Sequence, residues 1–297
     1  SGDTLHVMPG TYTQSLVVSK SGVTVEGNGA VIDGASPHGI HVPPAVSNVT
    51  VRGFSVQRIN SHAIFVEGKS VTIAGNVVYH SVLENGSLSN GVVTCRNGAW
   101  GSAIKIGVGG ENVNIRNNTV FGNCGEGIAA TRGVNVVIDG NTSYDNHAAN
   151  IYIDNSVNAQ VLNNHVYCDK KSAMAIAIGE EYYSGWGAKL RDVVVRNNLI
   201  EGCSKAVMAF ESEVNGTMTN VSIDGNIVPS GSGSGGVISL DNTKNSNVSV
   251  TNNQLYRLQF WVRSPSGVTL SNNTLYSGGA TSTPTATAIP PTATHTS

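Results

Sequence analysis

The residues best suited to chemistry are a lysine, an arginine, a tyrosine and several carboxylates near the middle of the chain. They stand at corresponding places in short β-branched segments, such as Ala-Ile-Lys105-Ile and Asn-Ile-Tyr152-Ile. Side chains of these types abstract and donate protons when they converge on one surface. The candidate catalytic residues are Lys105, Arg132, Tyr152, Asp154, Glu211 and Asp241.

One reaction that suits this set is β-elimination, in which a base removes the proton beside the carboxylate of a uronate sugar. Lys105 and Arg132 fall on adjacent repeats, so one can abstract the proton while the other neutralises the carboxylate. Tyr152 can protonate the leaving oxygen. Ca²⁺ can also neutralise the carboxylate, and this hard cation prefers oxygen ligands. Its expected ligands are Glu180, Glu181, Glu211 and Asp241.

A second reaction that suits the carboxylates is hydrolysis of a glycosidic bond between two acidic side chains. An alignment of the repeats places Glu211 and Asp241 one repeat apart, about 5 Å by strand spacing. The same alignment places Asp154 and Glu211 two repeats apart, about 10 Å. The first separation suits a retaining pair and the second an inverting pair, so both remain open.

Aromatic side chains near these residues offer flat apolar faces on which sugar rings can stack. Tyr182, Tyr183 and Trp186 lie in one insertion, and Trp100 ends another. Long insertions in a regular repeat commonly lie at the functional face. A non-catalytic polysaccharide-binding or cell-surface module needs only these aromatics, which keeps binding open as a third interpretation.

A repeated run of alternating β-branched residues predicts the element that positions all of these side chains. Most runs end in Gly-Asn or Asn-Asn, and from Asn118 onward most steps between them are 20 to 28 residues. Alternation with period two indicates strands with one buried face. We therefore predict an all-β, single-stranded, right-handed parallel β-helix of about ten coils. The stacked asparagines are expected to form a hydrogen-bonded ladder.

A second strand precedes each asparagine strand and should carry two outward rows of side chains. The aligned residues of the first row are His41, Phe65, Lys105, Ala129, Tyr152, Ala177, Ala209 and Ser239. Those of the second row are Glu67, Gly107, Thr131, Asp154, Gly179, Glu211 and Asp241. Insertions near residues 83–100 and 180–186 bracket the part of these rows that holds the candidate residues.

Composition excludes several partners. The net charge is −2 and charged residues make up 12%, so no basic surface for nucleic acid is expected. No apolar run reaches the length of a membrane-spanning helix. The four cysteines show no zinc-binding spacing, and we predict the disulfides Cys95–Cys124 and Cys168–Cys203.

The end of the chain has a different composition. Residues 1–278 are expected to form the β-helix domain, and residues 279–297 read as a Thr/Pro-rich linker to a further module. We therefore expect a secreted, multimodular, monomeric protein whose partner is a polysaccharide substrate.

The opening segment up to Tyr12 and the later Val31-Ile-Asp-Gly34 are similar to the N-terminal cap of the pectate-lyase-like superfamily of right-handed β-helices. A partial resemblance links residues 100–105 and 123–129 to two motifs of family 9 polysaccharide lyases. Gly101, Ala103, Lys105 and Gly127 match these motifs, whereas Glu126 is the one acid in place of that family's Ca²⁺ ligands. The resemblance implies the fold and an activity on polysaccharides, without that family's complete Ca²⁺ site. Lyase is the favoured interpretation, ahead of a hydrolase and a non-catalytic binder.

Overall fold

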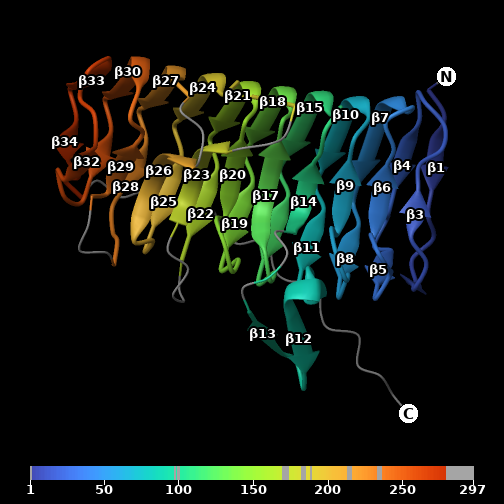
Figure 1. The fold of residues 1–297 in the computed structure, drawn as a ribbon. Helices are drawn as coiled ribbons and strands as arrows, with labels where there is room; N and C mark the ends of the chain where they lie inside the picture. Colours follow the sequence, from blue (N-terminus) through green and yellow to red (C-terminus); the bar gives the residue numbers. More distant parts are fainter. Residues whose placement is uncertain are drawn as a thin grey trace.

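Three parallel sheets, each built from one strand per coil, form the body of the protein. The computed structural model describes residues 2–96, 98, 101–168, 174–181, 185–187, 189–212, 216–232 and 236–278. The chain runs from sheet A to sheet B to sheet C in each coil and then returns to sheet A, one strand further along the stack (Figure 1). This arrangement is a parallel β-helix, as predicted. Sheets A and B have eleven strands each, close to the predicted ten coils.

Sheet A is formed by eleven strands, most of which precede one of the recurring asparagines. They are β1 (Thr4–His6), β4 (Thr24–Glu26), β7 (Ser47–Arg52), β10 (Lys69–Ala74), β15 (Glu111–Arg116), β18 (Val134–Asp139), β21 (Val157–Leu162), β24 (Arg191–Arg196), β27 (Met218–Asp224), β30 (Asn245–Thr251) and β33 (Val268–Ser271).

Sheet B is formed by eleven short strands, most of which follow one of these asparagines. They are β2 (Thr11–Tyr12), β5 (Val31–Asp33), β8 (Ser55–Gln57), β11 (Val77–Tyr79), β16 (Thr119–Phe121), β19 (Thr142–Tyr144), β22 (His165–Tyr167), β25 (Leu199–Glu201), β28 (Ile227–Val228), β31 (Gln254–Leu255) and β34 (Thr274–Leu275). The repeat had indicated two strands per coil. The third strand was not predicted because its two or three residues are too few to show an alternation.

Sheet C carries the predicted outward rows. Its strands are β3 (Leu16–Val17), β6 (Ile40–Val42), β9 (Ile64–Val66), β14 (Ser102–Ile106), β17 (Glu126–Thr131), β20 (Ile151–Asp154), β23 (Met174–Glu181), β26 (Lys205–Ser212), β29 (Ile238–Asp241) and β32 (Phe260–Val262).

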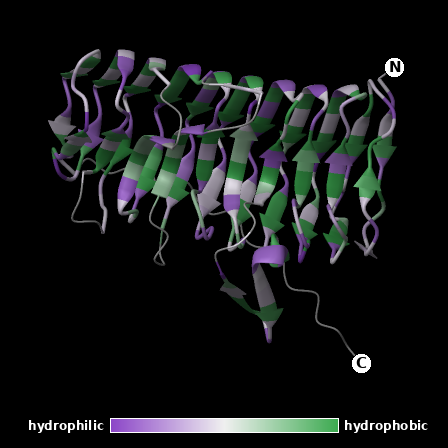
Figure 2. Ribbon diagram, viewed as in Figure 1, coloured by the Kyte–Doolittle hydropathy of each residue, from purple (hydrophilic) through white to green (hydrophobic). Residues whose placement is uncertain are grey.

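Apolar side chains of all three sheets point into one continuous core. On neighbouring strands of sheet A, Val113 lies beside Val136 and Ile115 beside Ile138, and all four are fully buried. Hydrophobic segments recur in this way along the strands of successive coils (Figure 2). Burying apolar surface stabilises the fold by about 25 cal/mol per Å², so the repeated alternation holds the coils in register.

The predicted asparagine ladder is confirmed. The amide of Asn118 donates to Asn141 Oδ1 at 2.9 Å, and the amide of Asn141 donates to Asn164 Oδ1 at 3.0 Å. The residue before each ladder asparagine takes the left-handed conformation, as at Asn117 (φ 55°) and Gly140 (φ 65°). Asparagine and glycine tolerate that conformation, which explains why both occur before the ladder position.

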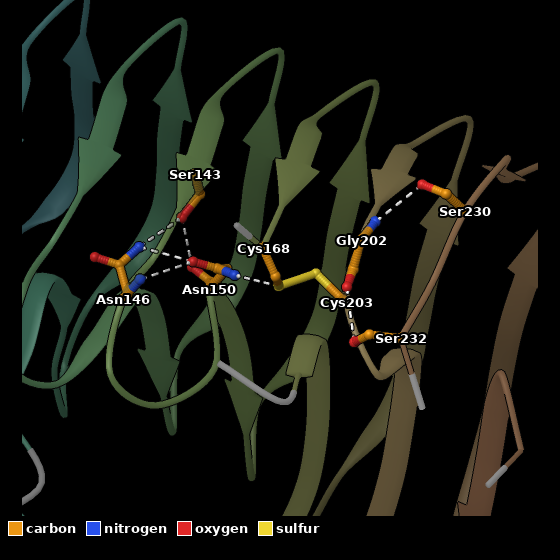
Figure 3. The surroundings of a disulfide bond; sticks show 8 residues. All are labelled: Ser143, Asn146, Asn150, Cys168, Gly202, Cys203, Ser230 and Ser232. Atoms are coloured by element: carbon orange, nitrogen blue, oxygen red, sulfur yellow. Dashed lines mark hydrogen bonds between the residues drawn. A yellow bond between two sulfur atoms is a disulfide. The ribbon is translucent and has the colours of Figure 1, made fainter. Parts of the chain in front are cut away.

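Both predicted disulfides are present, and each links neighbouring coils. Cys95 is bonded to Cys124, and Cys168 to Cys203. Figure 3 shows the second bridge, with the amide of Asn150 directed at Cys168 Sγ over 3.5 Å. Both bridges lie where the chain passes from sheet B to sheet C.

The two insertions lie at opposite ends of the strands of sheet C. The first contains a single 3₁₀ turn, η1 (Leu83–Asn85), and a hairpin of β12 (Gly86–Ser89) and β13 (Val92–Cys95), which projects from the stack (Figure 1). The second follows β23 and leads into sheet A. Within the described residues, no helix is long and apolar enough to cross a membrane.

Candidate functional site

The outer face of sheet C holds two of the predicted catalytic residues, Lys105 and Tyr152, in one row. Lys105 lies between Phe65 and Ala129 of the adjacent strands, and Ala129 lies beside Tyr152. Lys105 and Tyr152 are therefore in one row, two coils or about 10 Å apart, as the sequence predicted. The buried Ala129 lies between them, and its small side chain projects little from the sheet.

The alignment of the repeats was wrong by one residue at β26. Met208 lies beside Ala177, and Phe210 lies between Gly179 and Asp241, so Glu211 is not in the row of Asp241. Glu211 instead lies beside Glu180. Residues 206–210 are apolar at every position. No alternation of polar and apolar residues could therefore show which side chains point outward.

Tyr152 is directed toward the C-terminal coils. Its hydroxyl donates a hydrogen bond of 2.8 Å to Glu181 Oε1 on the adjacent coil, and the side chain is buried. A side chain at Gly179 would collide with the Tyr152 hydroxyl, so glycine there leaves room for the tyrosine. The tyrosine and the carboxylate form one hydrogen-bonded unit.

Glu126 is a member of the site that the prediction left out. It is the first residue of β17, is only 4% exposed, and accepts a 2.6 Å hydrogen bond from Ser102 Oγ. Burial raises the pKa of its carboxyl group, the carboxylate of Glu181 adds to the rise, and the charge of Lys105 opposes it. Glu126 is the one acidic residue in residues 123–129, and this was the signal that could have identified it.

Glu180 has a structural role near the C-terminal end of β23. Its Oε1 accepts a hydrogen bond from the backbone of Lys189 at 2.8 Å, and Oε2 accepts one from Leu190 at 2.7 Å. These bonds close the insertion after β23. Burial raises the pKa of the Glu180 carboxyl, and the neighbouring Glu211 adds to the rise.

Arg132 directly follows β17, at this same end of the sheet C strands and three residues beyond Ala129. Its guanidinium carbon lies 5.7 Å from the centre of the Trp186 ring, and the Lys189 ammonium lies 4.5 Å from it. The Trp186 indole is also 3.4 Å from the carbonyl oxygen of Asn155, to which it donates. Asp154 is buried on the neighbouring strand. Arg132 thus lies against Trp186, whereas the neighbours of Lys105 are Phe65 and Ala129.

The four carboxylates predicted to bind Ca²⁺ do not gather at one point, although Glu180 and Glu211 lie side by side. Glu181 accepts from Tyr152, Glu180 from backbone amides, and Asp241 is 3.7 Å from Arg263. Glu211 accepts from the Thr243 hydroxyl. Across the described part of the chain, no three histidine, cysteine or acidic residues are grouped to hold a metal ion. These residues do not fit the predicted calcium site. Tyr182, Tyr183 and Trp100 lie outside the described residues.

Three imidazole rings contact Phe65, which lies directly beside Lys105. The Phe65 ring centre is 4.9 Å from His38, 4.9 Å from His62 and 5.2 Å from His41. His62 Nδ1 accepts a hydrogen bond from the Ser102 backbone at 3.2 Å. Burial lowers the pKa of His62 to about 4, with the charges of Lys105 and His38 adding to the effect.

Comparison with known proteins supports the fold. A family model for the right-handed β-helix region matches residues 38–184. The chain is a right-handed parallel β-helix. No curated protein sequence matches it.

Several solved structures share this β-helix. The surface protein and adhesin PfbA of Streptococcus pneumoniae has a TM-score of 0.63 at 13% identity, over 92% of this chain and 81% of that one. The mannuronan C-5 epimerase AlgE4 A-module of Azotobacter vinelandii gives 0.56 at 15% identity, over 93% and 81%. The pectate lyase Pel9A gives 0.52 at 16% identity, over 94% and 72%. At these identities the likeness concerns the fold alone.

Proposed function

We propose that this β-helix is an extracellular polysaccharide lyase and that the outer face of sheet C is its active site. The observation that carries the proposal is the placement of Lys105 and Tyr152 in one outward row, separated only by Ala129. The solved structures with this fold include proteins named for mannuronan and pectate. The two disulfides favour an oxidising, extracellular compartment.

The proposed reaction divides two proton transfers between these residues. Lys105, as the free amine, takes the proton from C5 of a uronate unit, and the electron pair of that C–H bond forms a C4=C5 double bond. The C4–O bond breaks, and Tyr152 gives its proton to the departing oxygen. Glu181 accepts the hydrogen bond of the Tyr152 hydroxyl in the resting protein and positions it. The products are an unsaturated end and a new reducing end.

The test is a polysaccharide panel of pectate, alginate, glycosaminoglycans, xylan and glucans, read for ultraviolet absorbance and for reducing ends. A lyase raises both signals together. Lys105→Ala should lower the rate by roughly 10²-fold or more. Lys205→Ala, at a half-buried lysine of the same sheet on β26, is the matched control and should not. Equal losses in both variants would overturn the role of Lys105.

Hydrolysis is the second candidate, and one observation favours it. Glu126 has a raised pKa in its buried position, whereas Glu181 accepts a hydrogen bond from Tyr152. Two carboxyl groups in such different surroundings can divide the roles of general acid and base. In that case reducing ends form without absorbance, and Glu126→Gln abolishes them. Retention on a polysaccharide without any turnover would instead indicate a binding module.

A further inference from the structure

The row that holds Lys105 and Tyr152 continues toward the N-terminus through Phe65 and His41. These two residues lie side by side on β9 and β6, and their rings are nearly parallel, with an interplanar angle of 15°. His38 and His62 stack on one another at 5.3 Å and flank the same phenylalanine. We call the set of His38, His41, His62 and Phe65 the ring cluster.

The ring cluster is placed on the outside of the coil, away from the core. Ile64 and Val66, on either side of Phe65 in sequence, are fully buried, whereas Phe65 itself is only half-buried. A Cβ at Gly107 would come within 2.7 Å of the Phe65 ring, so this ring lies over the backbone of the Lys105 strand. The cluster therefore reaches the edge of the proposed reaction centre.

The charge of the ring cluster differs from that around Lys105. A carboxyl group lies at the edge of the cluster, where Glu67 Oε2 is 2.9 Å from His41 Nε2. Burial lowers the pKa values of His38 and His62, which favours the neutral form of both rings. An acidic sugar unit would be repelled by Glu67 here, whereas hydroxyl and amide groups can bond to Glu67 and the imidazoles.

We propose that the ring cluster is a subsite for an uncharged sugar unit, next to the position at which Lys105 takes the uronate. This inference rests on the proposed function and narrows its substrate to a heteropolysaccharide in which a uronate adjoins an uncharged sugar. The apolar face of that sugar stacks on the Phe65 ring, and its polar groups bond to Glu67 and the imidazoles.

Binding is measured in the full chain carrying Lys105→Ala, which removes turnover. The probes are hyaluronan, gellan and xanthan, which contain both uronate and uncharged sugars, and polygalacturonate and alginate, which contain only uronates. A heteropolymer should bind more tightly than both homopolymers. Phe65→Ala should weaken that binding roughly tenfold, in the range of one lost ring contact.

Two further variants make the test specific. Gly107→Ala keeps every ring but displaces Phe65, and should weaken binding to the heteropolymer in the same direction. Trp261→Ala removes an exposed ring from the same row of sheet C, beside Ser239 and far along the stack, and should change nothing.

The outcomes separate the subsite from the lyase proposal. Homopolymers bound as tightly as heteropolymers, or binding unchanged by Phe65→Ala, would overturn the subsite even if the wild-type chain is a lyase. Binding that depends on Phe65, without turnover of the same polymer by the wild type, would overturn the lyase and leave the subsite. No binding to any of the probes would overturn both.

Discussion

The phenol of Tyr152 and the carboxylate of Glu181, on neighbouring coils, are joined by a 2.8 Å hydrogen bond. Tyr152 is 8% exposed, and its ring is nearly parallel to that of Phe210 at 6.1 Å. The hydroxyl is consequently held in one position, facing the carboxylate. A proton donor that is already oriented costs little reorganisation during the reaction.

Removal of the Tyr152 hydroxyl should slow the reaction without unfolding the protein. Tyr152→Phe keeps the ring and its packing and deletes the proton donor, so the rate should fall roughly 10²-fold. Absorbance of unsaturated product at saturating polysaccharide measures kcat. Glu181→Gln retains an acceptor for the phenol and should have the smaller effect. A larger loss in Glu181→Gln than in Tyr152→Phe would move the acid–base role to Glu181.

The neutral state of His62 should make stability depend on pH. The pKa of His62 is about 4 in the fold, against 6.5 for an unperturbed histidine, so the unfolded chain binds more protons between these values. This contribution is fully present above pH 6.5 and is lost as the pH falls toward 4, for a total of about 3 kcal/mol.

Unfolding midpoints at pH 4.5 and 7.5 test this dependence. His62→Asn keeps an acceptor for the Ser102 backbone but cannot titrate, so its stability should vary less between the two pH values than that of the wild type. His6→Asn, at a side chain that is 61% exposed, is the control and should follow the wild type. The same dependence in all three proteins would assign it to other groups.

The asparagine ladder should contribute strongly to stability at its centre. Asn141 Oδ1 accepts from both the backbone and the side chain of Asn118, and Asn141 is 1% exposed. Asn141→Ala leaves the buried backbone N–H of Asn118 without an acceptor, at about 1–3 kcal/mol, and deletes the hydrogen bonds that the Asn141 amide donates to Ile115, Asp139 and Asn164. Thermal and urea unfolding should show a loss of roughly 3 kcal/mol.

An outer ladder provides the matched control. The amide of Asn135 donates to Asn112 Oδ1 at 2.8 Å at the exposed surface, and its φ of 54° suits glycine. Asn135→Gly should cost less than about 1 kcal/mol because water can replace the bond. Equal losses at Asn135 and Asn141 would show that burial does not set the contribution of the ladder.

The fold could be predicted from the sequence because its determinants are local and repeated. Each coil contains the same alternation and the same asparagine, so one misread coil leaves the others intact. The site could be predicted only in part. Lys105 and Tyr152 were placed correctly because Ile residues flank them on both sides. Glu211 was not, because its strand is apolar on both faces.

Contacts between distant segments explain the remaining differences. Glu126 belongs to the site because it is buried against Ser102, which lies 24 residues earlier. Arg132 turns toward Trp186, which belongs to an insertion with no counterpart in the repeat. No pattern within one strand reports either contact. The same holds for Phe65, whose ring cluster combines residues of two coils.

The calcium prediction can be tested at Glu211. Its Oε2 is buried with no hydrogen-bond partner in the described structure, and its charge adds to the rise that burial causes in the pKa of Glu180 on the neighbouring strand. Because Glu180 already accepts two backbone amides, we expect added Ca²⁺ to leave the unfolding midpoint unchanged. Glu211→Gln should be at least as stable as the wild type in metal-free buffer, since it removes the repulsion of like charges.

A bound cation would give a different pattern. Ca²⁺ at 100 times its dissociation constant would stabilise the fold by about 2.7 kcal/mol. That gain would disappear in Glu211→Gln and persist in Glu111→Gln, whose carboxylate is paired with Lys69 on sheet A at 2.9 Å. A stabilisation of this kind would restore the calcium site predicted from the sequence, and it would require Glu180 to exchange its backbone hydrogen bonds for the cation.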